Sequence, residues 1–313
     1  MALHPQAQLL IDAALEAELP ALETLTPAKA RELYNLRTSD LPTTPSIGEV
    51  TDRTIPGPGG QNTIRIYRPV GTGPASAEGT TTPALMFFHG GGWVIGTIDT
   101  HDVVCQALCE ATNATVVSVE YRLAPEHCFP AAPDDCTAAT KWVAANGAEI
   151  GVDGSRIALC GDSAGGNLAA VVSLDLVDGP KISAQALVYP ATEFDREATG
   201  SLAENSDGYL LTTAAMAWFS DHYAPSESDR RNPRCSPLLG ELASLPPTIV
   251  LTAEYDPLRD EGRDFAAALD KAGIEVEHVD YEGQIHTFFT QVGFMDASLD
   301  AVGRIADFVT ARW

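Results

Sequence analysis

The strongest chemical signal in this sequence is a serine between glycines. Gly161-Asp-Ser-Ala-Gly165 is a GxSxG pentapeptide, placed between an apolar run that ends at Cys160 and a helical pattern that follows it. In a strand–turn–helix of this type the turn is so tight that side chains beside the serine would collide with neighbouring backbone. The serine then sits at a helix N-terminus, where negative charge is favoured. The pattern predicts a nucleophile at Ser163.

A second glycine-rich segment could supply the amide groups that such a nucleophile needs. His89-Gly-Gly-Gly-Trp93 directly follows the apolar run Ala84–Phe88. Glycines there allow main-chain N–H groups to face the oxyanion that forms when a serine attacks a carbonyl, and the residue after the nucleophile, Ala164, adds another donor. A phosphate-binding loop is the competing interpretation, but no GxGxxG or GK[ST] pattern follows.

Of the seven histidines, one lies where a general base belongs. His286 occurs in a loop after the last strand-like run and before the last helical pattern. This placement fits the chain order serine, acid, histidine. His278 falls inside a strand-like run, where a packed or edge residue is expected. The remaining histidines have no strand-end context: His4, His101, His127 and His222.

The acid is expected at the end of the strand that precedes this histidine. Asp256 follows the run Thr248–Thr252, and its role would be to fix the tautomer of His286 and stabilise its charged form. Glu254 and Asp260 are the alternatives, although Asp260 suits the first turn of the following helix. We interpret Asp162, beside the serine, as structural.

Short apolar runs and helical patterns alternate along the chain, as they do in a mainly parallel sheet covered by helices on both faces. The strand-like runs are Asn62–Arg68, Ala84–Phe88, Thr115–Val119, Arg156–Cys160, Ala184–Tyr189, Thr248–Thr252 and Val276–Tyr281. The helical patterns are Asp134–Asn146, Gly165–Leu176, Arg259–Ala272 and Asp296–Ala311. The sequence therefore predicts an α/β fold.

Two segments do not fit this alternation. Residues 1–45 predict one or two helices with an apolar stripe, and residues 193–235 are irregular apart from a helix near Thr213–His222. Both could cover one edge of the sheet as a cap. The aromatic residues that could line a covered pocket are Trp93, Phe194, Trp218, Phe219 and Phe288.

Composition excludes several classes of function. The 313 residues include 19 basic and 43 acidic side chains, a formal charge of −24, which would repel nucleic acids and anionic membranes. No apolar stretch reaches the length of a membrane span, and the N-terminus lacks the features of a signal peptide. Six cysteines show no zinc spacing, and Cys105 and Cys109 would share a helix face, so we expect reduced thiols in the cytoplasm. No motif implies a metal or cofactor.

In this combination the motifs resemble the bacterial hormone-sensitive lipase-like (family IV) carboxylesterases of the α/β-hydrolase fold. The resemblance covers residues 60–313 and rests on motifs in the family's order: His89-Gly-Gly-Gly-Trp93, Tyr121-Arg-Leu-Ala-Pro-Glu126, Gly161-Asp-Ser-Ala-Gly165, Asp256-Pro-Leu-Arg-Asp260 and the His286 loop. It implies a mostly parallel eight-stranded sheet with a helical cap. Residues 1–45 and 193–235 would form the cap, and residues 46–192 and 236–313 the catalytic domain.

Carried over to this sequence, the resemblance implies a catalytic triad and an oxyanion hole. The triad would be Ser163, Asp256 and His286, and the oxyanion donors would be Gly91, Gly92 and Ala164. Whether Gly90 also points inward is open at this point. Two positions depart from the family pattern: Thr287 stands where glycine is frequent, and Glu120 where aspartate is frequent.

The activity to expect is hydrolysis of short- to medium-chain acyl esters through an acyl-enzyme. The expected partner is a small-molecule ester substrate, with no nucleic acid and no membrane. A serine amidase or peptidase, an acyltransferase and a non-catalytic ligand-binding protein are the alternatives. The last strand could pair with a second copy in a homodimer, although the charges of Glu275, Glu277 and Asp280 also suit an edge protected against pairing.

Overall fold

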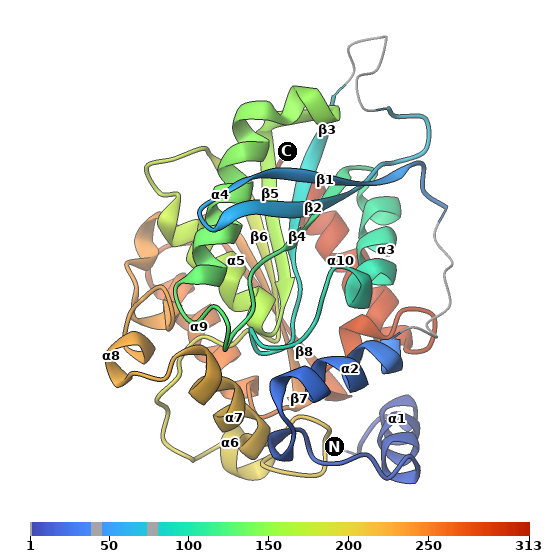
Figure 1. The fold of residues 1–313 in the computed structure, drawn as a ribbon, viewed down its shortest axis with the longest axis vertical. Coiled ribbons are helices and arrows are strands. Elements are labelled where there is room, and N and C mark those ends of the chain that lie inside the picture. Colours follow the sequence, from blue (N-terminus) through green and yellow to red (C-terminus); the bar gives the residue numbers. More distant parts are fainter. Residues whose placement is uncertain (1, 39–45, 74–80) are drawn as a thin grey trace.

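Eight strands form one continuous sheet in the computed structural model, which describes residues 2–38, 46–73 and 81–313 (Figure 1). The strand order is β1-β2-β4-β3-β5-β6-β7-β8. The strands β1 and β2, and likewise β2 and β4, pair antiparallel, whereas all other neighbours pair parallel. This confirms the predicted mainly parallel sheet. The strands are β1 Val50–Gly57, β2 Gly60–Tyr67, β3 Thr82–Phe88, β4 Thr115–Glu120, β5 Val152–Asp162, β6 Ile182–Val188, β7 Thr248–Tyr255 and β8 Val276–Ile285.

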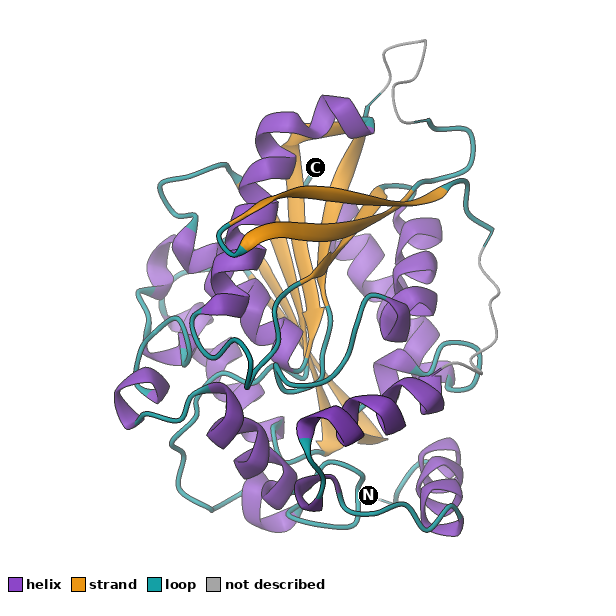
Figure 2. Ribbon diagram, viewed as in Figure 1, coloured by secondary structure: helices purple, strands orange, loops and turns teal. Residues whose placement is uncertain are grey.

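Helices cover both faces of the sheet (Figure 2). One layer consists of α4, α5 and α9, and the other of α3 and α10, as their packing in two separate apolar clusters shows. These helices are α3 Asp102–Thr112, α4 Ala131–Asn146, α5 Ala164–Asp175, α9 Arg259–Lys271 and α10 Asp296–Thr310. Within the described ranges, none of the helices has the length and apolarity needed to cross a lipid bilayer.

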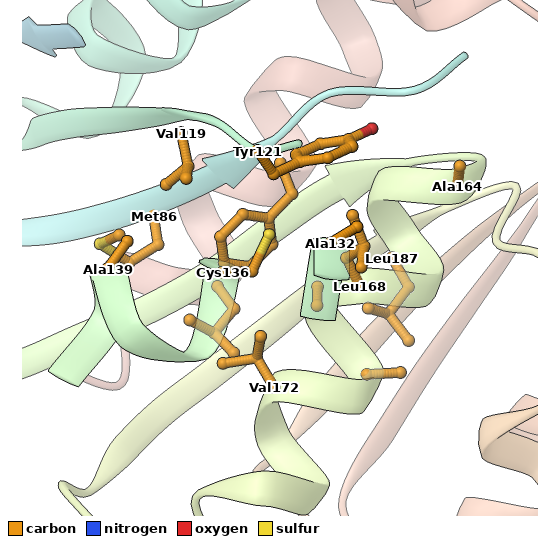
Figure 3. Close-up of a cluster of buried hydrophobic side chains, with 14 of the residues drawn as sticks. Met86, Val119, Tyr121, Ala132, Cys136, Ala139, Ala164, Leu168, Val172 and Leu187 are labelled. Carbon is orange, nitrogen blue, oxygen red and sulfur yellow. The ribbon is translucent and has the colours of Figure 1, made fainter. Parts of the chain in front are cut away.

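Neighbouring residues of the central strands point into opposite layers, which is why these strands are apolar throughout. In β3, Met86 and Phe88 belong to the cluster under α4 and α5, whereas Leu85 and Phe87 belong to the cluster under α3 and α10. Figure 3 shows the first of these clusters, with side chains of α4 and α5 packed against the strands. Each fully buried side chain of this size contributes about 1.5–3 kcal/mol, so the sheet is a rigid support for the loops at its ends.

Residue pattern predicted seven of the strands and missed β1. In that strand Ile55 is the only fully buried residue, and Asp52, Arg53 and Pro56 interrupt any apolar run. An edge strand of this composition pairs through its backbone, not through a buried face.

The remaining helices lie beyond the carboxyl ends of the parallel strands (Figure 1). They are α1 Pro5–Glu16, α2 Pro27–Thr38, α6 Ser201–Glu204, α7 Thr213–Tyr223 and α8 Glu227–Arg230. The N-terminal segment and residues 193–235 thus lie at the same end of the sheet, although they are far apart in the sequence. Part of the predicted N-terminal segment, residues 39–45, lies outside the described residues.

Candidate active site

Ser163 occupies a sharp turn between β5 and α5. Its φ of +56° and ψ of −118° lie outside the regions that most residues adopt. A hydrogen bond to the neighbouring strand fixes the turn, because the Ser163 N–H donates to the carbonyl oxygen of Val188, the last residue of β6, at 2.8 Å. The serine side chain is thereby raised above the ends of the strands, at the N-terminus of a buried helix.

The two glycines of the pentapeptide are required by close backbone contacts. A Cβ atom on Gly161 would lie 2.2 Å from the carbonyl oxygen of Gly165, and one on Gly165 would lie 1.8 Å from that of Phe88. Real Cβ atoms do not approach oxygen so closely. Any side chain at either position would push β5, α5 or β3 apart.

Three side chains from different strand ends form one chain of hydrogen bonds. His286 Nε2 lies 3.0 Å from Ser163 Oγ, and His286 Nδ1 lies 2.7 Å from Asp256 Oδ2. The second oxygen of Asp256 accepts the N–H of Leu258 at 2.8 Å. Asp256 is fully buried and His286 is 5% exposed. The hydroxyl can therefore pass its proton to a histidine whose orientation a buried carboxylate fixes.

The alternative acids have other partners. Glu254 accepts the N–H of Gly283 at 2.7 Å. Asp260 stands in the first turn of α9 and accepts the N–H of Ser201 at 2.8 Å. Asp256 is thus the acid of this segment that contacts His286.

Gly91 and Gly92 line the same cavity as Ser163, as does Ala164 at the start of α5. Both glycines have positive φ, +117° and +56°. Within the described ranges the N–H groups of Gly91 and Gly92 donate to no main-chain or side-chain acceptor. These amides are available to an oxygen atom in the cavity.

Gly90 faces away from the cavity. Its N–H donates to Asp162 Oδ1 at 3.0 Å and lies 3.3 Å from His101 Nε2. The same Asp162 oxygen is 3.3 Å from His101 Nε2. Asp162 therefore holds the glycine loop, in keeping with the structural role expected for it.

This support is buried and charged. Burial alone would raise the pKa of the Asp162 carboxyl, but the neighbouring His101 and the hydrogen bond from the main chain outweigh burial and lower it. Burial lowers the pKa of His89 to about 3, so its ring is neutral. The Tyr121 hydroxyl donates to the His89 carbonyl at 2.7 Å, and the two rings stack.

Helical segments enclose a cavity of about 430 Å³ above Ser163. We call α1, residues 17–25, α2 and residues 193–223 the roof, and the loops 89–95, 161–164, 254–258 and 286–291 the floor. The roof side chains that line the cavity are mostly apolar and include Leu10, Ala13, Ala14, Ala17, Leu22, Leu211, Met216 and Phe219.

The aromatic residues proposed for this pocket divide into two groups. Trp93, Phe194 and Phe219 line the cavity, as predicted. For Trp218 and Phe288 the prediction is wrong: Trp218 packs beside His222, and Phe288 is fully buried between Tyr189 and Tyr281.

The structure gives Glu120 a structural role and gives Thr287 an unusual backbone conformation. Glu120 Oε2 accepts the N–H of Ile98 at 2.8 Å, so it supports the chain after the glycine loop. Thr287 has a φ of +78°, a left-handed conformation that glycine adopts at no cost.

Three functional candidates escaped sequence analysis. Neither His101 nor Asn205 lies in a sequence pattern that would predict its place near the site. Asn205 Nδ2 donates to the carbonyl oxygen of Asp256 at 3.1 Å. Glu261 is 2% exposed and lines the cavity, and burial raises its pKa to about 8. A signal for Glu261 did exist, because it shares the inward face of α9 with Phe265 and Leu269, four and eight residues further on.

Among the described residues, no group of three or more histidine, cysteine, aspartate or glutamate side chains is placed to hold a metal ion.

Known proteins with related sequences and structures place this arrangement in a family. A family model for the α/β hydrolase fold matches residues 85–290. The esterase LipI of Mycobacterium tuberculosis is 42% identical over 280 residues, which cover 87% of this chain and 86% of LipI. The carboxylesterase NlhH of the same species is 38% identical over 291 residues, covering 90% of this chain and 89% of NlhH.

A solved structure agrees over almost the whole chain. The ester-hydrolase EH1AB1 from the metagenome of Lake Arreo, complexed with a derivative of bipyridine phosphonate, superposes with a TM-score of 0.91 at 40% identity. The match covers 99% of this chain and 98% of that one.

Fold and site together define the class: the chain belongs to the α/β hydrolase fold family. Within it, the matches confirm the predicted resemblance to hormone-sensitive lipase-like esterases and the predicted class of enzyme, a carboxylic ester hydrolase.

Proposed function

We propose that this enzyme cleaves esters through a covalent acyl-enzyme on Ser163, with His286 as general base and acid and Asp256 as the partner of His286. The observation that supports this most directly is the position of His286, which is within hydrogen-bond distance of both Ser163 Oγ and Asp256 Oδ2. Each of the three residues follows a different strand of the rigid sheet.

In the acylation step, Ser163 Oγ attacks the ester carbonyl carbon as its proton passes to His286 Nε2. The carbonyl oxygen becomes an oxyanion, which the N–H groups of Gly91, Gly92 and Ala164 hold. The tetrahedral intermediate then collapses, the bond to the alcohol oxygen breaks, and His286 returns the proton to that oxygen.

Deacylation repeats these steps with water. A water molecule gives its proton to His286 and attacks the acyl carbon, and the bond to Ser163 Oγ breaks as the proton returns to the serine. The buried carboxylate of Asp256 stabilises the charged histidine in both halves of the reaction.

The substrates that fit this site best are small esters of short- to medium-chain acids. The cavity of about 430 Å³ has predominantly apolar walls and the size of a small-molecule pocket. With p-nitrophenyl esters we expect the highest kcat/KM between the acetate and octanoate chain lengths. A rate that rises through the C12 to C16 esters would contradict this preference.

We further infer that the segments 1–45 and 193–235 act as a cap over a catalytic domain of residues 46–192 and 236–313. The arrangement that supports this is the roof, whose residues line the cavity opposite the floor. A cytoplasmic location is supported by six cysteines that are all unpaired. A homodimer remains a prediction for light scattering to test.

The test of this function is the loss of activity in S163A. We expect kcat for p-nitrophenyl butyrate to fall roughly 10⁴-fold or more, because the nucleophile is removed while the fold is kept. The matched control is S155A, an exposed serine of the same strand, which should retain full activity.

A phosphonate ester should label the unaltered enzyme on the peptide that contains Ser163 and leave S163A unlabelled. Hydrolysis of the p-nitroanilide at a rate equal to that of the ester would favour an amidase. Ester exchange that outruns hydrolysis in dilute alcohol would favour an acyltransferase. Retained ester hydrolysis in pure S163A would contradict the proposal.

A further inference from the structure

Thr287, the residue after His286, has a backbone conformation that does not suit it. Its φ of +78° lies in the left-handed region, which β-branched residues rarely adopt because the Cβ substituents crowd the backbone. Such outliers persist where the surrounding structure enforces them, and they cluster at functional sites. Ser163 is another example in this protein, with φ +56°.

The hydroxyl of Thr287 adds a second unfavourable feature. Its Oγ1 is buried and has no hydrogen-bond partner among the described residues. A hydroxyl removed from water without a partner destabilises the folded state. Neither the backbone nor the hydroxyl therefore explains why threonine stands here, because glycine would avoid both costs.

What Thr287 does have is a place on the wall of the cavity. It lines the cavity beside His286, and Thr290 and Gln291 of the same segment line it as well. In the proposed reaction His286 returns its proton to the departing alcohol oxygen, so the alcohol half of the ester lies on the histidine side. The oxyanion amides of Gly91 and Gly92 hold the carbonyl oxygen instead.

We infer that Thr287 is a specificity-determining residue whose bulk restricts the alcohol half of the substrate to unbranched, primary alcohols. This inference rests on the proposed function, since it needs His286 to face the leaving alcohol. Branched secondary and tertiary alcohols place methyl groups next to the ester oxygen, where they meet the side chain of Thr287. A single methyl group in a pocket changes kcat/KM by about 10- to 200-fold.

The experiment compares three butyrate esters, of ethanol, 2-propanol and tert-butanol, by pH-stat titration. In T287G we expect the ratio of kcat/KM for the isopropyl ester to that for the ethyl ester to rise at least about tenfold. T287A, which retains only Cβ, should lie between T287G and the unaltered enzyme. An unchanged ratio in T287G would overturn the inference.

Two controls separate bulk from other causes. Valine has almost the same shape as threonine but lacks the hydroxyl, so T287V should discriminate between the alcohols as the unaltered enzyme does. If T287V instead has the ester ratio of T287G, the hydroxyl and not the bulk of Thr287 is responsible. Branching in the acid half is tested with ethyl butyrate and ethyl pivalate, whose ratio should be the same in T287G and the unaltered enzyme. A change in this second ratio of the same size would contradict a role on the alcohol side.

Thermal unfolding completes the test. Glycine relieves the left-handed backbone, so T287G should unfold at a higher temperature than the unaltered enzyme. A gain in branched esters together with a lower unfolding temperature would indicate a loosened site and would overturn the inference. If instead the unaltered enzyme and S163A hydrolyse ethyl butyrate equally slowly, the proposed function itself has failed.

Discussion

The floor and the roof of the cavity are built in different ways. In the floor, Asp256 and His286 are buried, and hydrogen bonds join them to each other and to Ser163. The roof contributes mostly apolar side chains from helices that lie beyond the strand ends. The polar side chains of the floor are thus positioned by the ends of strands, whereas the apolar lining of the pocket comes mostly from helices.

This contrast has an energetic consequence. In the proposed reaction, groups of the floor stabilise charge in the transition state, so a change there should affect kcat by orders of magnitude. A change in the roof alters contacts that the bound ester and the transition state share. It should therefore affect KM, and the change in KM should be smaller than the change in kcat that a floor variant causes.

Among variants that keep Ser163, the largest effect is expected for D256N. Asparagine keeps the shape and can still accept the N–H of Leu258, but it presents an amide group where His286 Nδ1 needs an acceptor. The histidine is then held in the wrong tautomer, and kcat should fall by about 10⁴-fold. Steady-state kinetics with p-nitrophenyl butyrate would measure this.

The matched control is D260N, which changes the neighbouring acid of the same segment. Asp260 binds the N–H of Ser201 and has no contact with His286, so its kcat should change only a few-fold. Equal losses in D256N and D260N would remove the distinction between the floor and its surroundings.

His101 tests whether the floor extends below the residues that line the cavity. In H101A the buried Asp162 loses its side-chain partner, which weakens the support that Asp162 gives to the glycine loop through the N–H of Gly90. We expect kcat to fall by about 10- to 100-fold with little change in KM, because the loop carries the amides that we propose as oxyanion donors.

Because a buried polar group that loses a hydrogen-bond partner costs about 1–3 kcal/mol, H101A should also unfold more easily. H101Q retains a donor for Asp162 and should recover most of both kcat and stability. A loss of stability in H101A with kcat unchanged would show that the pair supports the fold alone.

Sequence predicted the floor far better than the roof, for physical reasons. Ser163 lies in a turn that tolerates only certain residues, so local pattern was sufficient to predict it, whereas His286 was predicted from the order of the motifs along the chain. His101 reaches Asp162 only through tertiary packing and has no local signature. In α7, Phe219 faces the cavity and Trp218 does not, because adjacent helix positions point about 100° apart and only packing determines which one faces inward.

The roof is tested by R31M. Arg31 of α2 donates to the carbonyl oxygens of Val94 at 2.7 Å and Ala124 at 2.8 Å, so it attaches the roof to the chain after the glycine loop. It also pairs with Glu126 and lowers the pKa of that carboxyl to about 2.

Methionine removes these bonds but keeps the apolar length of the side chain. We expect KM to rise about 3- to 10-fold while kcat stays within a factor of about two, because the roof makes contacts that the bound ester and the transition state share. Lys29 of the same helix forms an exposed ion pair with Glu32, so K29M should leave KM unchanged. A loss in kcat larger than the rise in KM would place Arg31 with the floor.

The smallest effect is expected for Glu261, which lies where floor and roof meet, and it is an effect on stability. Glu261 of α9 accepts the N–H of Thr192 at 2.7 Å, just before the roof segment that begins at residue 193. Burial raises its pKa from an ordinary value near 4.5 to about 8. The folded protein therefore holds a proton on Glu261 that the unfolded chain releases between these two pH values.

Wherever the folded state binds more protons, raising the pH destabilises it, by up to about 1.4 kcal/mol per pH unit for one group. The contribution of Glu261 is thus complete below pH 4.5 and is lost as the pH rises to about 8. E261Q mimics the protonated acid at every pH and removes this loss. Urea unfolding should show E261Q close to the unaltered protein at pH 5 and more stable at pH 8.

The exposed Glu277 of β8 provides the control, because E277Q should unfold like the unaltered protein at both pH values. If the difference in stability between E261Q and the unaltered protein is the same at pH 5 and at pH 8, Glu261 is charged in the folded state. The hydrogen bond to Thr192 would then join two elements through a carboxylate, and the start of the roof would be held as the floor is, by a buried charge.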